Sequence, residues 1–219
     1  MDGKKLSFSE DDLVDMRLGM GEEGFVFYYN DFALKVYHTK CGKVRLDEKT
    51  CKRMLDIHTN YVLLPKGVLY DSKHHFTGYY TDYIHGRYTK DIVSLKMKDF
   101  KEQLDVVYKE LEKLANQHVY VTDLHHGNFC YDGDFFFVDP GSYTIEDNMS
   151  SSRLLTHNQT EFSNFIHDYI FGDLIYGPKS RKKKKISNYF EGYENLVDIL
   201  DDDASEDETV KKYIKRIMD

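Results

Sequence analysis

The first third of the chain contains short runs of aromatic and β-branched residues, a pattern typical of β-strands. FVFYY at 25–29 and FALKVY at 32–37 are separated only by Asn30 and Asp31, which suit a tight hairpin turn. Two further strands are predicted within VLLPKGVLY at 62–70 and HHFTGYYTDYI at 74–84. This part of the chain therefore predicts a small, antiparallel sheet.

The rest of the chain changes to helical periodicity. Residues 98–118 predict the clearest helix, because apolar residues recur there every three or four positions. The resulting apolar face consists of Phe100, Leu104, Val107, Leu111, Leu114 and His118. We also expect helices at 43–58, 159–175, 187–200 and the C-terminus, short strands within 119–143, and a loop at 142–157. A strand-rich first third followed by a helix-rich remainder predicts an α+β fold.

Composition narrows the class of protein. With 219 residues, 41% apolar and 15% aromatic, the chain has the length and apolar content of one domain, or of two closely packed lobes. A net charge of −8 argues against general nucleic-acid binding, which requires a basic surface. Cys41, Cys51 and Cys130 lack CxxC spacing, so we expect reduced thiols rather than disulfides or a zinc site.

No run of residues has the length of a membrane span, and the N-terminus lacks the apolar stretch of a signal peptide. We therefore expect a cytoplasmic protein without an integral membrane segment. Secretion by a route that needs no such signal stays open.

Three glycines, Gly19, Gly21 and Gly24, form a G-x-G-x-x-G pattern ahead of a predicted strand. A glycine turn between antiparallel strands can lie over a nucleotide, with its N–H groups facing the phosphates. Lys35 on the next strand would point a cation at the same phosphates. The alternative is a flexible turn beside a solvated lysine.

A second group of polar residues lies in VYVTDLHHGNFCYDGDFFFVDPGSY at 119–143. Asp123, Asn128 and Asp139 each follow or precede a short apolar run. Phosphoryl transfer needs a phosphate cradle, a lysine, oxygen ligands for magnesium and a carboxylate that orients the attacking hydroxyl. The chain carries all of these: the glycines come first, then Lys35, then the carboxylate Asp123, then the oxygen ligands Asn128 and Asp139.

The motifs LGMGEEGFV, FALKV, TDLHHGN and VDPG, in this order and spacing, resemble the protein-kinase-like superfamily. DLHHGN is similar to the catalytic loop of atypical bacterial-type kinases and aminoglycoside phosphotransferases. The resemblance runs from about residue 17 to about residue 175. It implies a two-lobed fold with an N-lobe at about 14–81, a hinge at about 81–86 and a mainly helical C-lobe at about 87–219.

The resemblance also implies roles for individual residues. Gly19, Gly21 and Gly24 would cover the ATP phosphates, and Lys35 would pair with the α- and β-phosphates. Asp123 would be the catalytic carboxylate. Asn128 and Asp139 would hold Mg²⁺, a cation that prefers hard oxygen ligands.

The same resemblance places a partner for Lys35 and an adenine pocket. The helix after Lys35 should supply a glutamate, for which we take Glu48, with Asp47 as the alternative. In the hinge, Thr81 would be the gatekeeper. The backbone of Asp82 and Ile84 would bond adenine, and Val26 and Ala33 would flank it.

Several features leave the acceptor open. Val121-Thr122 stand where kinases usually have His-Arg or His-Gly, and Pro140 replaces the phenylalanine of the DFG motif. We expect an ATP- and Mg²⁺-dependent kinase, with a protein serine or threonine as the favoured acceptor. The alternatives are a small-molecule kinase and, third, a pseudokinase that acts as a binding module.

Two other features have competing interpretations. His125 could contact the γ-phosphate or the substrate, whereas His126 is expected to be structural. The run KSRKKKK at 179–185 could bind acidic partners or anionic lipid, but a solvated loop balanced by the acidic run at 201–208 is favoured.

Overall fold

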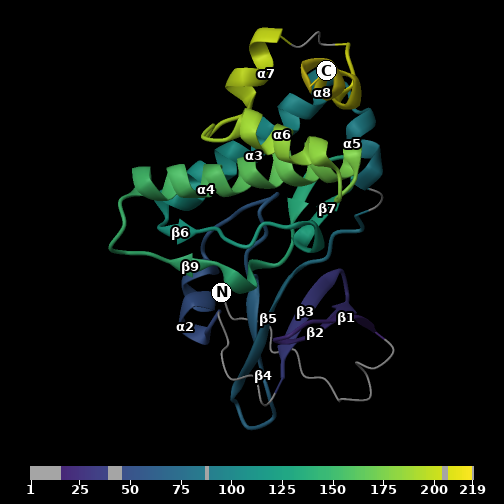
Figure 1. Cartoon of the computed structure of the whole chain (residues 1–219). Coiled ribbons are helices and arrows are strands. Elements are labelled where there is room, and N and C mark those ends of the chain that lie inside the picture. Colours follow the sequence, from purple (N-terminus) through teal and green to yellow (C-terminus); the bar gives the residue numbers. More distant parts are fainter. Residues whose placement is uncertain (1–15, 39–45, 87–88, 204–206, 219) are drawn as a thin grey trace.

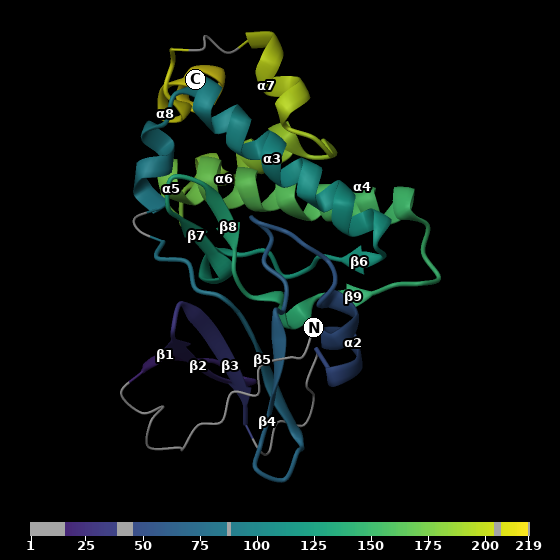
Figure 2. The same cartoon turned by 180° about the vertical axis from the view of Figure 1, so that it is seen from behind.

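The computed structural model describes residues 16–38, 46–86, 89–203 and 207–218. It has the predicted α+β character, with a five-stranded antiparallel sheet, two two-stranded sheets and several helices. The five-stranded sheet lies at one end of the molecule and most helices lie at the other (Figures 1 and 2). We call residues 17–82 the sheet region and residues 89–218 the helical region. Cys41, the start of the predicted 43–58 helix and part of the acidic run lie outside the described residues.

The large sheet contains the predicted strands. Its spatial order is β1 (Arg17–Met20), β2 (Gly24–Tyr29), β3 (Phe32–Tyr37), β5 (Phe76–Asp82) and β4 (Gly67–Tyr70). The turn between β2 and β3 is formed by Asn30 and Asp31, with φ of 47° and 64°. Asn and Asp tolerate this left-handed conformation better than most residues. The resulting register places Lys35 opposite Val26 on one side and Tyr79 on the other.

The first helix is shorter than the predicted 43–58. α2 spans Glu48–Met54, because the side chain of Asp47 accepts a 2.8 Å bond from the N–H of Thr50 and caps the helix there. α2 buries Cys51 and Met54 and packs against β4 and β5.

The helical region begins with a 3₁₀ turn, η1 (Thr89–Ser94), and α3 (Met97–Asn116), which confirms the helix predicted at 98–118. The other helices are α4 (Ser151–Phe165), the π-helical η4 (Ile166–Asp173), α5 (Leu174–Tyr176), α6 (Arg181–Phe190), α7 (Val197–Asp203) and α8 (Val210–Met218). Among the described helices, none combines the length and the apolar character needed to cross a bilayer.

Three sequence predictions in this region were wrong in their boundaries. α4 begins inside the predicted loop at 142–157, because the hydroxyl of Ser150 accepts a bond from the Arg153 N–H. The helix predicted at 187–200 is two helices, α6 and α7. The basic run, expected as a loop, forms the first turns of α6, since Ser180 caps that helix through the Lys182 N–H.

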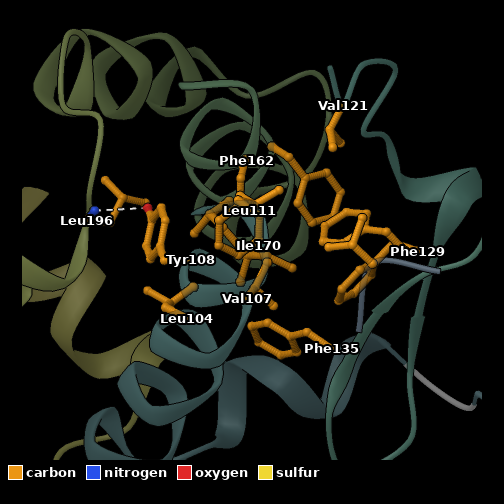
Figure 3. Packing of buried hydrophobic residues seen from close by; sticks show 14 of the residues in the cluster. Leu104, Val107, Tyr108, Leu111, Val121, Phe129, Phe135, Phe162, Ile170 and Leu196 are labelled. Carbon is orange, nitrogen blue, oxygen red and sulfur yellow. Dashed lines mark hydrogen bonds between the residues drawn. The ribbon is translucent and has the colours of Figure 1, made fainter. Parts of the chain in front are cut away.

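The main core lies against the predicted apolar face of α3. Phe100, Leu104, Val107, Leu111 and Leu114 have no exposed surface. Figure 3 shows several of these side chains packed with aromatic residues of the short strands and of α4. The buried Tyr108 hydroxyl accepts a 3.0 Å bond from the Leu196 N–H, which ties the segment before α7 to α3.

Two short pairs of strands frame the loops that carry the polar residues of the 119–143 stretch. β6 (Val119–Tyr120) pairs with β9 (Thr144–Ile145), and β7 (Phe129–Tyr131) pairs with β8 (Phe135–Phe137). β8 is anchored to the chain before β4, because Phe137 donates to Tyr61 O and accepts from Leu63 N, both at 2.8 Å.

That anchoring segment is held in turn by Glu110 of α3. Its buried carboxylate accepts bonds from the N–H groups of Asn60, Tyr61 and Val62, at 2.6 to 2.9 Å. One buried side chain therefore fixes the strand that leads to Asp139.

We expect Glu110→Gln to lower the free energy of unfolding by about 1–3 kcal/mol. The amide has one acceptor oxygen in place of two, so at least one buried N–H loses its bond. Urea unfolding monitored by circular dichroism measures the change. Glu112→Gln on the exposed face of α3 is the matched control and should leave the midpoint unchanged; equal midpoints for both variants would contradict the anchoring role.

Candidate nucleotide-binding site

A cavity of about 390 Å³ lies between the sheet region and the short strands of the helical region. Gly21, Glu22, Glu23, Gly24, Val26, Lys35, Asp123, His125, Asn128, Asp139, Gly141 and Ser142 line it. Eight of these residues were named from the sequence, namely Gly21, Gly24, Val26, Lys35, Asp123, His125, Asn128 and Asp139. Segments more than 100 residues apart in the chain thus contribute to one site.

The centre of the cavity is an ion pair between Lys35 and Asp139. The ammonium Nζ of Lys35 lies 3.0 Å from Oδ1 and 2.8 Å from Oδ2 of Asp139. It also lies 3.1 Å from Oε2 of Glu23, in the turn between β1 and β2. Lys35, the one lysine among the described residues that line the cavity, is therefore shared by two carboxylates.

The pairing changes the acidity of both groups. Burial by itself would lower the pKa of Lys35, but the adjacent Asp139 and Glu23 outweigh it and raise the pKa. Burial by itself would raise the pKa of Asp139, but Lys35, the Tyr79 hydroxyl and the Gly141 N–H hold it below the ordinary value. Both groups are therefore charged at neutral pH.

Asp139 is held in place by two further donors. The Tyr79 hydroxyl donates to Oδ1 at 2.7 Å, and the Gly141 N–H donates to the same oxygen at 2.9 Å. A Cβ at position 141 would come within 2.7 Å of Lys35 Nζ. A side chain at position 141 would therefore displace the lysine head group from its place beside Asp139.

Asp123 lies in a backbone conformation that few residues adopt, with φ of 63°. Asn128 reaches back to this residue, since its Nδ2 donates to the Asp123 carbonyl at 3.2 Å. The His125 Nε2 lies 3.7 Å from Asp123 Oδ1, while its Nδ1 accepts from the Gly127 N–H at 3.0 Å. A neutral His125 ring therefore carries its proton on Nε2, the nitrogen that faces Asp123.

The loops of Asp123 and Asp139 are bonded to each other. The Thr122 hydroxyl donates to Ser142 O at 2.9 Å, and the Ser142 hydroxyl donates to Thr122 O at 3.1 Å. This reciprocal pair joins the residue before Asp123 to the turn after Asp139. It fixes the two carboxylates on the same wall of the cavity.

The glycines of the β1–β2 turn have different surroundings. A Cβ on Gly24 would lie 2.1 Å from the Val36 carbonyl, so this position requires glycine for strand packing. A Cβ on Gly19 or Gly21 would meet no atom of the described residues within 4 Å. Packing against this part of the chain gives no reason for glycine at these two positions. They leave open space where a ligand could approach the backbone.

The predicted pair between Glu48 and Lys35 is not formed. Glu48 instead accepts bonds from Lys52 at 2.6 Å and from the Tyr70 hydroxyl at 2.7 Å, on the exposed side of α2. Asp47, the alternative, caps α2. Because Asp47 caps α2, the helix starts only at residue 48. Glu48 therefore lies in its first turn, where its side chain bonds Lys52 and Tyr70 and not Lys35. Glu23 forms the pair that was assigned to Glu48.

The predicted hinge residues lie next to the cavity lining but are not part of it. Thr81, at the end of β5, is buried and its hydroxyl donates to the Asp82 carbonyl at 3.1 Å. Ala33 pairs with Thr81 across the β3–β5 ladder. Ile84 follows β5, on the chain that connects the sheet region to η1. Gly19 also lies outside the lining.

Sequence reasoning missed Glu23, Tyr79, Thr122 and Ser142. Glu23 had a usable signal, since a carboxylate inside a glycine turn lies close to whatever the turn covers. Tyr79 could have been found from strand register, because it lies directly opposite Lys35. His126, expected to be structural, stacks on the Tyr169 ring with 5.6 Å between centroids and does not line the cavity.

The donor set of the cavity fits magnesium. Asn128 and Asp139 offer carboxamide and carboxylate oxygens, and Mg²⁺ commonly takes only one or two carboxylates besides phosphate and water. Within the described ranges no cluster of three His, Cys, Asp or Glu side chains forms a self-contained metal site. A metal ion bound by Asp139 would contact the same carboxylate that the Lys35 ammonium group now bonds.

The sequence matches no protein-family model and no curated protein sequence. A function for this chain is therefore inferred from the geometry of the cavity and from the motif resemblance.

Acid should weaken the fold through Asp139. Its pKa is lower in the folded state than in the unfolded chain, so its stabilising contribution is present above about pH 4 and is lost as pH falls through the folded pKa. We expect Asp139→Asn to be less stable at pH 7 and to lose less stability between pH 5 and pH 3. Thermal melts across this range measure the slope. The exposed Asp132→Asn control should follow the wild type, and parallel curves for all three proteins would contradict the assignment.

Proposed function

We propose that the chain is an ATP- and Mg²⁺-dependent phosphotransferase with a two-lobed, protein-kinase-like fold. In this proposal the sheet region with α2 is the N-lobe, the chain after β5 is the hinge, and the helical region is the C-lobe. The antiparallel sheet, its single described helix and the position of the cavity support this arrangement.

One observation carries the proposal. The cavity gathers Lys35, Asp123, Asn128 and Asp139 under a glycine turn, although they come from three separate segments. Phosphoryl transfer needs this combination of a cation, oxygen donors and a carboxylate. A structural ion pair between Lys35 and Asp139 would explain two of these residues but not the other two.

The charge of the cavity argues for a divalent cation. Glu22, Glu23, Asp123 and Asp139 place four carboxylates beside one lysine, a net formal charge of −3. A triphosphate alone would be repelled. Mg²⁺ held by Asn128 and Asp139 would neutralise charge on the phosphates and on the cavity wall.

Lys35 would change partners when a nucleotide binds. Its ammonium group now bonds Asp139 and Glu23, and phosphate oxygens could take the place of one carboxylate. Glu23 would continue to orient the lysine in the role first assigned to Glu48. The open space beside Gly19 and Gly21 would let the turn lie close to the phosphates.

Asp123 would act on the acceptor. The acceptor oxygen forms a bond to the γ-phosphorus while the bond from that phosphorus to the β–γ bridging oxygen breaks. The hydroxyl proton passes to the Asp123 carboxylate, and ADP leaves. His125, with Nε2 directed at Asp123, would hold the carboxylate or contact the transferred group.

The surroundings of Asp123 favour a protein hydroxyl as acceptor. The side chains of Asp123 and His125 are each 47% exposed, so this wall of the cavity is open to solvent. Small-molecule acceptors are generally enclosed in a concave pocket, whereas an exposed carboxylate can reach a serine or threonine on another protein. A small-molecule acceptor is the second candidate, because DLHHGN is similar to the loop of the aminoglycoside phosphotransferases.

Asp123→Asn tests the catalytic assignment. We expect transfer to fall by roughly 10²–10⁴-fold, the usual contribution of a general base, while Mg²⁺-dependent ATP binding stays within twofold. Asparagine keeps the shape and tolerates the positive φ, so folding should be preserved.

The measurements are a transfer rate with labelled ATP and a thermal shift with ATP, with and without Mg²⁺. Saturating ligand should raise the melting temperature by several degrees, and only when Mg²⁺ is present. Asp132→Asn is the matched control. Equal rates in wild type and Asp123→Asn would leave the residue with a turn-capping role, and ATP binding without any transfer would favour a pseudokinase.

Labelled ATP added with a cell lysate should place the label on serine or threonine of proteins, and the same lysate with Asp123→Asn should give little label. Separation of protein from small molecules before counting provides the readout. Label found only in the small-molecule fraction would overturn the protein acceptor and support the second candidate.

A further inference from the structure

Helix α6 presents a basic face to solvent. Its exposed stripe contains Arg181, Lys184, Lys185 and Tyr189, at helical spacing, while Ile186 and Phe190 are buried on the other side. α6 lies in the helical region, away from the five-stranded sheet (Figures 1 and 2).

The position of these charges is unfavourable for the helix itself. Five basic residues, 181–185, occupy the first five positions of α6, next to the positive end of the helix dipole. Like charges three or four positions apart also repel one another. Local helix stability therefore gives no reason for basic residues here.

Only part of the run is neutralised by the fold. Lys183 forms a 2.7 Å ion pair with Asp173, and the Lys182 ammonium lies 5.3 Å from the centre of the Tyr176 ring. Arg181, Lys184 and Lys185 form no ion pair with the described part of the chain. α8 packs against α6 and adds the exposed residues Lys211, Lys212 and Lys215.

We infer that the exposed face of α6 docks on an anionic phospholipid bilayer. Each basic side chain near such a surface contributes attraction to lipid phosphates and carboxylates. Tyr189, 46% exposed and one turn after Lys185, can place its ring at the headgroup level. Cations and an aromatic residue on one helical face are typical of helices that lie on membrane surfaces.

Other anionic partners fit less well. An acidic peptide would need a groove, and the hollow of about 750 Å³ that Tyr189 lines together with Glu194 and Asp198 would place carboxylates against it. Recognition of nucleic acids favours the bidentate guanidinium of arginine, and 181–185 contains one arginine and four lysines. A lysine ammonium group acts as a point charge and needs no fixed bonding geometry, so it suits the diffuse negative potential of an anionic bilayer.

The test is co-sedimentation of the full chain with vesicles at about 100 mM salt, a concentration at which surface charges are still only partly screened. We expect binding to phosphatidylcholine vesicles that contain phosphatidylserine and no binding to pure phosphatidylcholine. Arg181→Ala/Lys184→Ala/Lys185→Ala should weaken binding about 100-fold, since each near-surface cation contributes about fivefold. The variant should also lose part of the salt dependence.

The matched control removes three basic residues from α3, as Lys98→Ala/Lys109→Ala/Lys113→Ala, and should bind within about threefold of the wild type. Tyr189→Ala should weaken binding without changing the salt dependence, which keeps the test informative if the triple variant unfolds. Absence of wild-type binding to anionic vesicles, or equal losses in both triple variants, would overturn the proposal. Tighter α6-dependent binding to duplex DNA or polyglutamate would replace the bilayer with that partner.

Discussion

The contact between Lys35 and Asp139 joins the sheet region to the helical region inside the cavity. The lysine is fixed by the β2–β3–β5 register, and the aspartate is fixed by β8 and by the turn at Pro140-Gly141. Removing Lys35 would leave Glu23 and Asp139 as two partly buried carboxylates without a cation, which costs more than the pair itself gains, whereas removing Asp139 would leave Lys35 paired with Glu23 alone. The other features of the site, from the Tyr79 hydroxyl to the missing side chain at Gly141, serve to keep these two groups in contact.

The same contact makes the site responsive to ligands. A lysine shared by two carboxylates can exchange one of them for another anion without being left unpaired. The excess of carboxylates around it makes that exchange unfavourable unless a cation enters with the anion. If the proposed function holds, electrostatics would favour a metal–anion complex over a free anion, without any base-specific contact. The Thr122–Ser142 bonds would keep Asp123 in position relative to Asp139 during such an exchange.

The sequence was informative where local chemistry decides structure. The β2–β3 hairpin follows from Asn30-Asp31 and the runs beside it, and α3 follows from its apolar face. The Lys35 partner could not be read this way, because it depends on where Asp47 caps α2 and on how far the β1–β2 turn folds over the sheet. Ser150 and Ser180 were cap signals that were not used, so α4 and the basic part of α6 were expected as loops. The hydrogen bonds of Glu110 and Thr122 join residues that are distant in sequence, so they could not be predicted from any local sequence pattern.

The charges of the chain are separated in space as well as in sequence. The cavity concentrates carboxylates between the sheet region and the short strands, whereas α6 and α8 carry exposed cations in the helical region. An anionic surface would attract α6 and repel the cavity, so the two features together would orient the molecule. Docking through α6 would place the helical region, and not the five-stranded sheet, at the lipid. A substrate protein held at the same bilayer would then meet Asp123 from the solvent side, where this carboxylate is exposed.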